Sequence, residues 1–383
     1  MFMGNNTKEE RDIMDYTPSF KPGKAFQFGC GRFRQEEHLL EQCAEEVVRV
    51  GHSPLLVCTD ISADIALEKI QTSLSGAGIT LRVLKYNGYC DLEAAGNYID
   101  QGITSGIDVI LGCGGGMILD FAKCMADMTG LPLITIPTSS ATCCAYTPLS
   151  VCYDKNGKSA GSPKYDWSIS AVLADMTILS QQPPRLMMAG ICDALSKKIE
   201  IEQRLQDHNA DSSDAGFALC YELAKYIYNR LDREWETAYR DIQVKTASKT
   251  VYDAVYFSIV GAGLISGLAN GSRQTAVGHK FYLYVRTAFT QEAAGFLHGE
   301  LVGIGDVAQL IYNGDPEEAA RYQRRLRNMG LPGSMADLGF PVPENTLDDC
   351  CAFINESSAM KGASDEDRER LKKALDFIIT EGK

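Results

Sequence analysis

The sequence predicts an α/β domain with a parallel sheet over residues 1–182, followed by an all-α domain over residues 183–383. In the first half, short and continuously apolar runs alternate with amphipathic stretches of helical length. That alternation is typical of parallel strands covered by helices on both faces. Beyond Pro183 and Pro184, long helical patterns dominate and strand signals are few. The cleft between two such domains is the expected place for an active site.

The elements of the first half follow one another in a βαβαβ order. Residues 54–58, 80–86, 107–111 and 133–136 are expected to be strands, and residues 63–74, 92–104 and 117–128 to be helices. In the second half, the helical patterns run over residues 186–206, 214–231 and 234–261, with several later ones.

Composition excludes several classes of function. The 383 residues carry a net charge of −13, which repels phosphate backbones, so we expect no nucleic-acid partner. No run approaches the roughly 18 apolar residues of a membrane span, and the polar N-terminal segment has no signal-peptide core. Thirteen scattered cysteines without a CxxC pair indicate reduced thiols. We therefore expect a cytoplasmic protein, without a membrane partner, that acts on a small molecule.

A glycine-rich loop, GCGGG at residues 112–116, lies between the expected strand 107–111 and the helix after it. Glycines there allow the backbone to approach a pyrophosphate, and the helix directs its N–H groups and positive end at that anion. The spacing differs from GxGxxG and the loop does not follow the first strand. A tight turn, or a close contact between helix and strand, is therefore the alternative interpretation.

Asp60 follows the expected strand 54–58. A carboxylate in that place can accept hydrogen bonds from an adenosine ribose and repel a 2′-phosphate, which favours NAD over NADP. The alternative is that Asp60 caps the N-terminus of the next helix.

Two of the five histidines, His279 and His298, and the carboxylate of Asp193 are candidate metal ligands in the helical half. One carboxylate with two imidazoles suits Zn²⁺ or Fe²⁺ with an open coordination position. An ion there binds a substrate oxygen and stabilises the alkoxide that develops as hydride leaves. Spacing alone does not show that the three residues meet. The alternative interpretation is that each histidine is a hydrogen-bonded structural residue.

Three separated stretches carry a family resemblance: VILGCGGGMILDFAKCMADMTGLPLITIPTSSATCCAYTPLSVCYDKNGK, LMMAGICDALSKKIE and GFLHGELVGIG. Over roughly residues 25–310 the chain resembles the glycerol dehydrogenase branch of the iron-containing alcohol dehydrogenase superfamily. In motif it is most similar to the hydroxycarboxylate dehydrogenase-like members. The resemblance implies a dehydroquinate synthase-like fold, a dinucleotide-binding first domain, a metal in the cleft and a homo-oligomer.

By motif, the resemblance makes Asp193, His279 and His298 the catalytic metal ligands. The positions that it assigns to NAD, with NADP as an alternative, are Asp60, Gly114, Gly115, Asp120, Thr138, Thr142, Leu149, Val151 and Tyr153. Tyr282 stands where relatives often carry a second histidine, which favours a three-ligand site and zinc over iron.

Other departures from the family pattern concern the substrate. Met117 replaces a lysine of the glycine motif, and Cys143 replaces an aspartate near the substrate hydroxyls of glycerol dehydrogenases. Losing that carboxylate removes an anion that repels carboxylate substrates. Arg273 and Lys280, beside His279, are candidate contacts for an anion, or solvated surface charges. Cys143 and Tyr146 are the expected substrate-pocket residues.

These observations predict a metal-dependent, NAD(P)-linked oxidoreductase that acts on a small alcohol by reversible hydride transfer. Its substrate is either a polyol such as glycerol or a 2-hydroxy acid with its 2-oxo partner, and the cysteine at position 143 favours the acid. Two alternatives remain. One is a cyclase like dehydroquinate synthase, and the other is a dinucleotide-binding sensor that has lost its metal.

Overall fold

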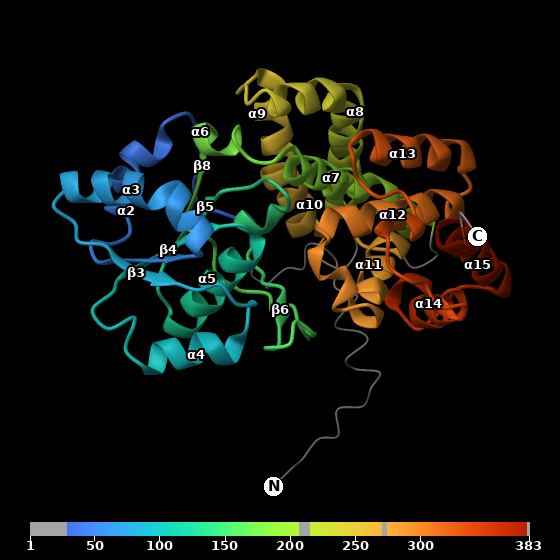
Figure 1. The fold of residues 1–383 in the computed structure, drawn as a ribbon, viewed down its shortest axis with the longest axis horizontal. Coiled ribbons are helices and arrows are strands. Elements are labelled where there is room, and N and C mark those ends of the chain that lie inside the picture. The colour runs from blue at the N-terminus through green and yellow to red at the C-terminus, as the bar shows by residue number, and fades with distance from the viewer. Residues whose placement is uncertain (1–28, 207–214, 270–273, 381–383) are drawn as a thin grey trace, which may run out of the picture.

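The computed structural model describes residues 29–206, 215–269 and 274–380. Its first half contains a six-stranded sheet in the order β1–β8–β5–β4–β2–β3, in which every neighbouring pair is parallel. The strands are β1 (Phe33–Glu36), β2 (Pro54–Cys58), β3 (Arg82–Lys85), β4 (Val109–Gly114), β5 (Leu133–Pro137) and β8 (Ala171–Asp175). The predicted α/β architecture is confirmed, with the sheet in one half of the molecule and helices in the other (Figure 1).

Successive strand residues enter two different cores, which explains why the four inner strands, β8, β5, β4 and β2, are buried along their whole length. Leu55 and Val57 of β2 belong to one core and Leu56 and Cys58 to the other. Helices α2 (Ala44–Val47) and α3 (Asp60–Gly76) cover one face, whereas α4 (Leu92–Asp100) and α5 (Gly116–Thr129) cover the other. Burial on both faces is what an all-parallel sheet requires.

Strands β1 and β8 and a small hairpin were not predicted. Strand β1 is short and mostly polar, whereas β8 is a buried apolar run, AVLAD, that pairs with β1 and β5 and that the prediction overlooked. The third element is a small hairpin of β6 (Cys152–Tyr153) and β7 (Ser159–Gly161), too short to leave a periodic signal. Strand β1 is thus defined by its pairing with β8 more than by local pattern.

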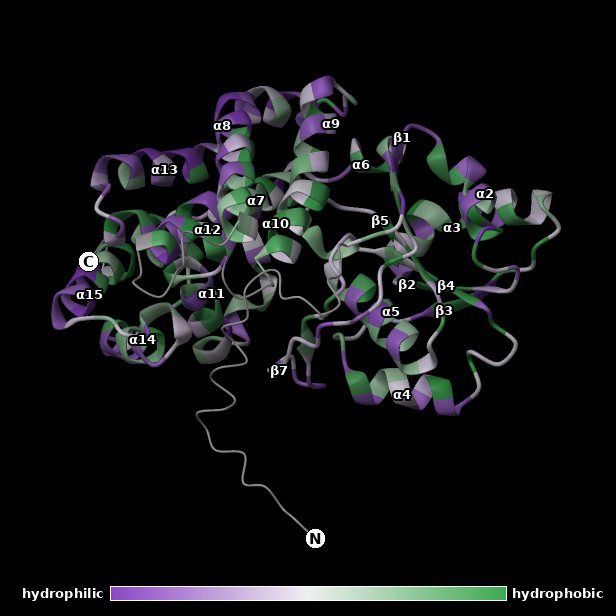
Figure 2. Cartoon of the chain, turned by 180° about the vertical axis from the view of Figure 1, so that it is seen from behind, coloured by the Kyte–Doolittle hydropathy of each residue, from purple (hydrophilic) through white to green (hydrophobic). Residues whose placement is uncertain are grey.

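The helical half consists mainly of α7 (Pro184–Gln206), α8 (Ala215–Gln243), α9 (Lys249–Tyr256), α10 (Ala262–Leu268), α11 (Val277–Ala288), α12 (His298–Tyr312), α13 (Pro316–Asn328), α14 (Thr346–Asn355) and α15 (Asp365–Thr380). Helix α12 is buried along nearly its whole length and packs against α7, α11, α13 and α15. Helices α13 and α15 lie on the outside and are largely hydrophilic (Figure 2). The predicted division after residue 182 falls between β8 and α7.

The predicted break between helices at residues 232–233 is wrong, because α8 continues through it to Gln243. The ion pair between Arg230 and Glu234, at 2.9 Å, spans that point, and Leu231 and Trp235 are both buried. Contacts at spacing i,i+4 on both faces keep the helix continuous.

The segment Lys249–Leu268 is long and apolar enough to cross a membrane, by length and composition alone. It comprises α9, a π-helical turn at Phe257–Gly261 and α10, and 67% of its most apolar window is buried inside the protein. Its packing against α8 identifies it as a core helix of the helical half.

Two glycines allow backbones to approach where the halves and the central helices meet. A Cβ atom at Gly190 of α7 would lie 1.9 Å from the carbonyl oxygen of Ser140, in the segment after β5. A Cβ atom at Gly299 of α12 would lie 1.9 Å from the carbonyl oxygen of Ala189. A side chain at either position therefore requires the backbone itself to move.

We expect Gly190→Ala to lower the free energy of unfolding by about 1–3 kcal/mol, the usual range for overpacking. The matched control is Gly96→Ala in α4, where nothing lies within 4 Å of an added Cβ. That change should raise stability by roughly 0.5–1 kcal/mol, because alanine loses less conformational entropy in a helix. Urea unfolding of both variants tests this, and equal effects of the two substitutions would contradict the close approach.

Candidate metal centre between the two halves

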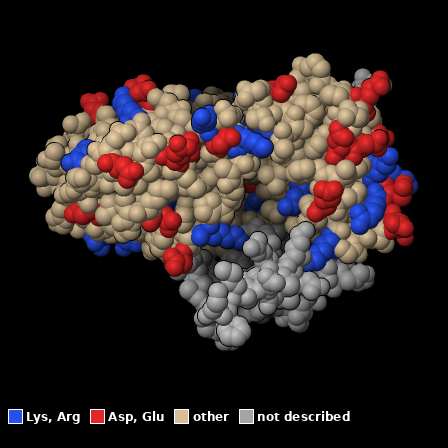
Figure 3. Space-filling view, turned by 90° about the horizontal axis from the view of Figure 1, so that it is seen from below, with Lys and Arg blue, Asp and Glu red and all other residues tan. Residues whose placement is uncertain are grey.

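The three predicted metal ligands converge from three helices. Asp193 lies on α7, His279 on α11, and His298 is the first residue of α12. Their ligand atoms all lie within 4.8 Å of one another. Seen from below, the surface is hollowed between the two halves, with charges of both signs scattered around it (Figure 3).

The distances fit a bound cation better than direct hydrogen bonds. The Nε2 atoms of His279 and His298 lie 3.8 Å and 3.6 Å from Asp193 Oδ1, too far for a hydrogen bond. Ligands at about 2.0–2.2 Å from a shared tetrahedral ion are separated by comparable distances. One carboxylate and two imidazoles therefore fit a zinc or ferrous ion, both in donor chemistry and in spacing.

Glu300 holds the start of α12 in place. Its carboxylate accepts a hydrogen bond from the Leu297 N–H at 2.7 Å and pairs with Arg185 of α7 at 2.6 Å. The acidic side chain also lies in the first helical turn, where the helix dipole favours negative charge. The ion pair between Glu300 and Arg185 thus ties α12 to α7 two residues after His298.

Glu200, which sequence reasoning missed, orients His279. Its buried carboxylate contacts His279 Nδ1 and accepts hydrogen bonds from the N–H groups of Ala276 and His279, the latter at 3.0 Å. Burial alone would raise the pKa of Glu200, but His279 and these backbone donors hold it below its usual value. A proton on Nδ1 leaves the Nε2 lone pair free for a metal. The sequence signal that could have identified Glu200 is its spacing, because it lies two helical turns beyond Asp193 and so on the same face of α7.

Lys197 is a second residue that sequence reasoning missed. Its buried ammonium lies 2.7 Å from Asp193 Oδ1, one helical turn along α7. Burial would raise the pKa of Asp193, but the charge of Lys197 and the proximity of His298 hold it far below its usual value. Burial lowers the pKa of His298, so its imidazole is neutral at pH 7 and free to act as a ligand.

Cys143 lies close to these charges. Burial raises the pKa of its thiol to about 12, the carboxylate of Asp193 adds to the rise, and Lys197 opposes it. At neutral pH the side chain of the predicted substrate residue is therefore an uncharged thiol that senses the charges of Asp193 and Lys197.

Four of the predicted cofactor residues meet at the start of α5. Gly114 ends β4 with φ +145°, and a Cβ there would lie 2.4 Å from Ile118 Cγ2, so a side chain is not tolerated. Gly115 is the N-cap of α5. Thr138 donates its N–H to the Gly114 carbonyl at 3.0 Å, and Thr142 Oγ1 lies 3.3 Å from where a Cβ of Gly116 would be. This helix N-terminus suits a phosphate.

Asp120, on the buried side of α5, holds two of the predicted cofactor residues, Leu149 and Val151, in place. Its carboxylate accepts a hydrogen bond from the Val151 N–H at 3.1 Å and pairs with Lys123 at 2.7 Å. Lys123 in turn donates to the carbonyl oxygen of Leu149. Burial raises the pKa of Asp120, and Lys123 opposes that rise. The structure thus places Asp120, Leu149 and Val151 in one network along α5.

The β6–β7 hairpin reaches the helical half through two tyrosines. Tyr153 of β6 lies close to Tyr282 of α11, and burial, followed by the proximity of this neighbour, raises the pKa of Tyr153. The Tyr282 ring packs edge-on against His298, with centroids 4.4 Å apart. Where relatives often carry a second histidine, this chain therefore has an aromatic contact between the predicted cofactor groove and the metal centre.

Asp60 does not cap α3, so that alternative is wrong: Thr59 is the N-cap, and its Oγ1 accepts a hydrogen bond from the Ser62 N–H at 3.0 Å. Asp60 is the first residue of the helix, exposed, and paired with Lys85 at 3.2 Å. Asn87 also donates to its carboxylate at 2.6 Å. The ribose contact stays a prediction.

The remaining predicted positions lie elsewhere. The Tyr146 ring packs beside Gly29 and Gly263, so it contacts both halves, and its substrate role stays a prediction. Met117 is exposed in the first turn of α5, and Lys280 is half-buried on α11. Arg273 lies outside the described residues.

Comparison with known proteins decides the family. Residues 30–181 match the model of iron-containing alcohol dehydrogenases. An uncharacterised oxidoreductase of Synechocystis is 30% identical over 313 residues, which cover 78% of this chain and 77% of the relative. The chain belongs to the iron-containing alcohol dehydrogenase family. It is accordingly an NAD-linked, metal-containing oxidoreductase that acts on alcohols, and the findings favour neither the cyclase nor the sensor.

Two further similarities are informative. Hydroxycarboxylate dehydrogenase A of Escherichia coli is 30% identical over 230 residues, 60% of this chain and 62% of the relative. The crystal structure of glycerol dehydrogenase from Schizosaccharomyces pombe has a TM-score of 0.81 at 22% identity and covers 94% of this chain and 92% of that one. The second similarity confirms the predicted fold.

We expect Glu200→Gln to weaken zinc binding by about 10–100-fold, the usual effect of removing the partner of a metal-binding histidine. The matched control is Glu202→Gln on the same helix, which loses an ion pair with Lys198. Competition with a chromophoric chelator measures both affinities. Equal affinity in the Glu200 variant and the wild type would show that the carboxylate does not prepare His279 for an ion.

Proposed function

We propose that the chain catalyses reversible hydride transfer between NAD and a small 2-hydroxy acid, with its 2-oxo acid as the partner. The observation that carries this choice is Cys143, a thiol that burial keeps uncharged and that lies in the electrostatic field of Asp193 and Lys197. An uncharged thiol tolerates a substrate carboxylate, whereas an aspartate at position 143 would repel it. The 30% sequence identity to a hydroxycarboxylate dehydrogenase over 230 residues supports the same substrate class.

Asp193, His279 and His298 would hold one divalent ion, and their three-residue donor set favours zinc over iron. When bound, the ion polarises the substrate oxygen and stabilises the developing alkoxide. Glu200 keeps His279 in the tautomer that presents Nε2, and Lys197 offsets negative charge around Asp193.

The chain's other residues position the cofactor, which carries the hydride. In this proposal Gly114, Gly115, Thr138 and Thr142 bind the pyrophosphate at the start of α5, and Asp60 binds the adenosine ribose, which favours NAD over NADP. Leu149, Val151 and Tyr153 line the groove that leads to the metal centre. The Tyr153–Tyr282 contact covers His298 and helps to keep water from the reacting atoms.

The proposal includes a division into two domains at residues 182/183 and a homo-oligomeric, cytoplasmic protein. The thirteen cysteines are all free, which suits a reducing compartment.

We expect zinc-loaded protein to oxidise NADH with 2-oxobutyrate faster than with dihydroxyacetone, and His298→Ala to abolish turnover of either substrate. Absorbance of NADH, with NADPH and iron-loaded protein in parallel, measures the rates. Turnover of dihydroxyacetone alone would assign a polyol substrate instead. Silence with both substrates, in protein that holds dinucleotide, would contradict the proposed substrate class.

We expect Cys143→Asp to lower kcat/KM for 2-oxobutyrate at least about tenfold relative to dihydroxyacetone, because a new carboxylate repels an anionic substrate. Cys143→Ser, which adds no charge, is the control and should keep the wild-type preference. Steady-state kinetics with both substrates give the ratio. A preference unchanged by the aspartate would place the substrate carboxylate away from position 143.

A further inference from the structure

A second cluster of metal-binding atoms lies in the sheet half, away from the centre already described. It consists of Cys90, in the segment between β3 and α4, Cys124 in the middle of α5, and Cys152 in β6. All three side chains are 0–1% exposed. We call these residues the cysteine cluster. Three thiols from separate elements meet here, although 34 and 28 positions separate them along the chain.

The three sulfur atoms form a nearly equilateral triangle. The Sγ–Sγ distances are 3.6 Å for Cys90–Cys124, 3.8 Å for Cys124–Cys152 and 3.9 Å for Cys90–Cys152. The centre of such a triangle lies about 2.2 Å from each sulfur, and a zinc–thiolate bond is about 2.3 Å. An ion slightly out of the sulfur plane would therefore reach all three sulfurs without a movement of the backbone.

The surroundings supply a polar neighbour on one side. The Tyr165 hydroxyl lies 3.4 Å from Cys124 Sγ and donates to Ser150 Oγ at 2.9 Å. A bound cation would displace the protons of the three thiols. Thiolate is the form that binds metal.

We propose that the cysteine cluster binds one thiophilic divalent cation, with zinc as the ion. Binding replaces the thiol protons with three sulfur–metal bonds and changes no oxidation state. Soft thiolate donors select zinc or cadmium over magnesium and calcium, which take oxygen ligands.

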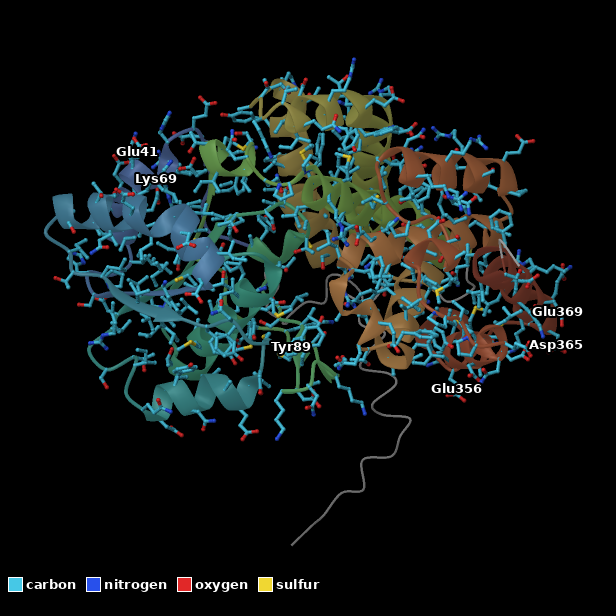
Figure 4. All side chains as sticks on the ribbon, in the orientation of Figure 1. Glu41, Lys69, Tyr89, Glu356, Asp365 and Glu369 are labelled. Carbon is cyan, nitrogen blue, oxygen red and sulfur yellow. The ribbon has the colours of Figure 1, made fainter. Side chains whose placement is uncertain are left out.

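The ion would fasten the β6–β7 hairpin to the sheet. Cys152 lies between Val151 and Tyr153, two of the predicted cofactor residues, and the Tyr153 N–H donates to the Cys90 carbonyl at 2.8 Å. The neighbouring Tyr89, labelled beside the hairpin in Figure 4, has its ring 5.9 Å from that of Tyr153. One ion would join α5, this segment and the hairpin, and so stiffen one wall of the cofactor groove.

The test is the metal content of zinc-loaded, desalted protein. We expect two zinc ions per chain in the wild type, one in the C90S/C124S/C152S variant and one in His298→Ala. The matched control is Cys113→Ser, a wholly buried cysteine of β4 outside the cluster, which should keep two. Cadmium in place of zinc should give thiolate-to-metal charge-transfer absorption in the wild type, His298→Ala and Cys113→Ser, and none in the triple variant.

The cadmium spectrum of His298→Ala keeps the test decisive if the triple variant does not fold, because it needs no change in the cluster. Its charge-transfer absorption should saturate at one cadmium per chain. Absence of that absorption would overturn the proposal, as would its persistence in a folded triple variant. Oxidation of two cluster thiols to a disulfide in metal-loaded protein, without displacement of zinc, would also overturn it.

Discussion

The close approach of α7, α11 and α12 is the constraint on which the metal centre depends. A Cβ at Gly299 would meet the Ala189 carbonyl of α7, and a Cβ at Gly305 would lie 2.4 Å from the Gly278 carbonyl oxygen of α11. These glycines bring three helix backbones near enough for Asp193, His279 and His298 to share one ion. A larger residue at Gly299 or Gly305 would push the helices apart and so separate the three ligands, although the ligands themselves stay unchanged.

The buried charges around that centre form one connected system. Asp193, Lys197 and Glu200 lie on one face of α7, and isolated charges there would be costly. Asp306 of α12 adds less to this cost, because burial and then the charge of Glu200 raise its pKa well above the usual value and favour its uncharged form. A divalent ion adds the positive charge that two ionised carboxylates and one lysine leave unbalanced. In the proposed function, the same residues therefore contribute to packing, ligand orientation and substrate choice.

The elements predicted correctly from the sequence are those whose own residues show a clear apolar pattern. The apolar runs identified β2, β3, β4 and β5, and the motif residues predicted to bind the metal lie close together on three neighbouring helices. Strand β1 was missed because it is mostly polar and pairs with β8, far along the chain, and the β6–β7 hairpin was missed because its strands are only two and three residues long. Lys197 and Glu200 were visible as positions one and two turns after Asp193. Their importance follows only from the contact of Glu200 with His279 and the ion pair of Lys197 with Asp193, which no helical period reveals.

The most direct test of the central claim is the anomalous scattering of zinc in crystals grown with NAD. The account predicts a strong peak within bonding distance of Asp193, His279 and His298, and a dinucleotide with its pyrophosphate at Gly114 and Gly115. A dinucleotide in that groove without a metal peak among these three residues, at full zinc loading, would contradict it.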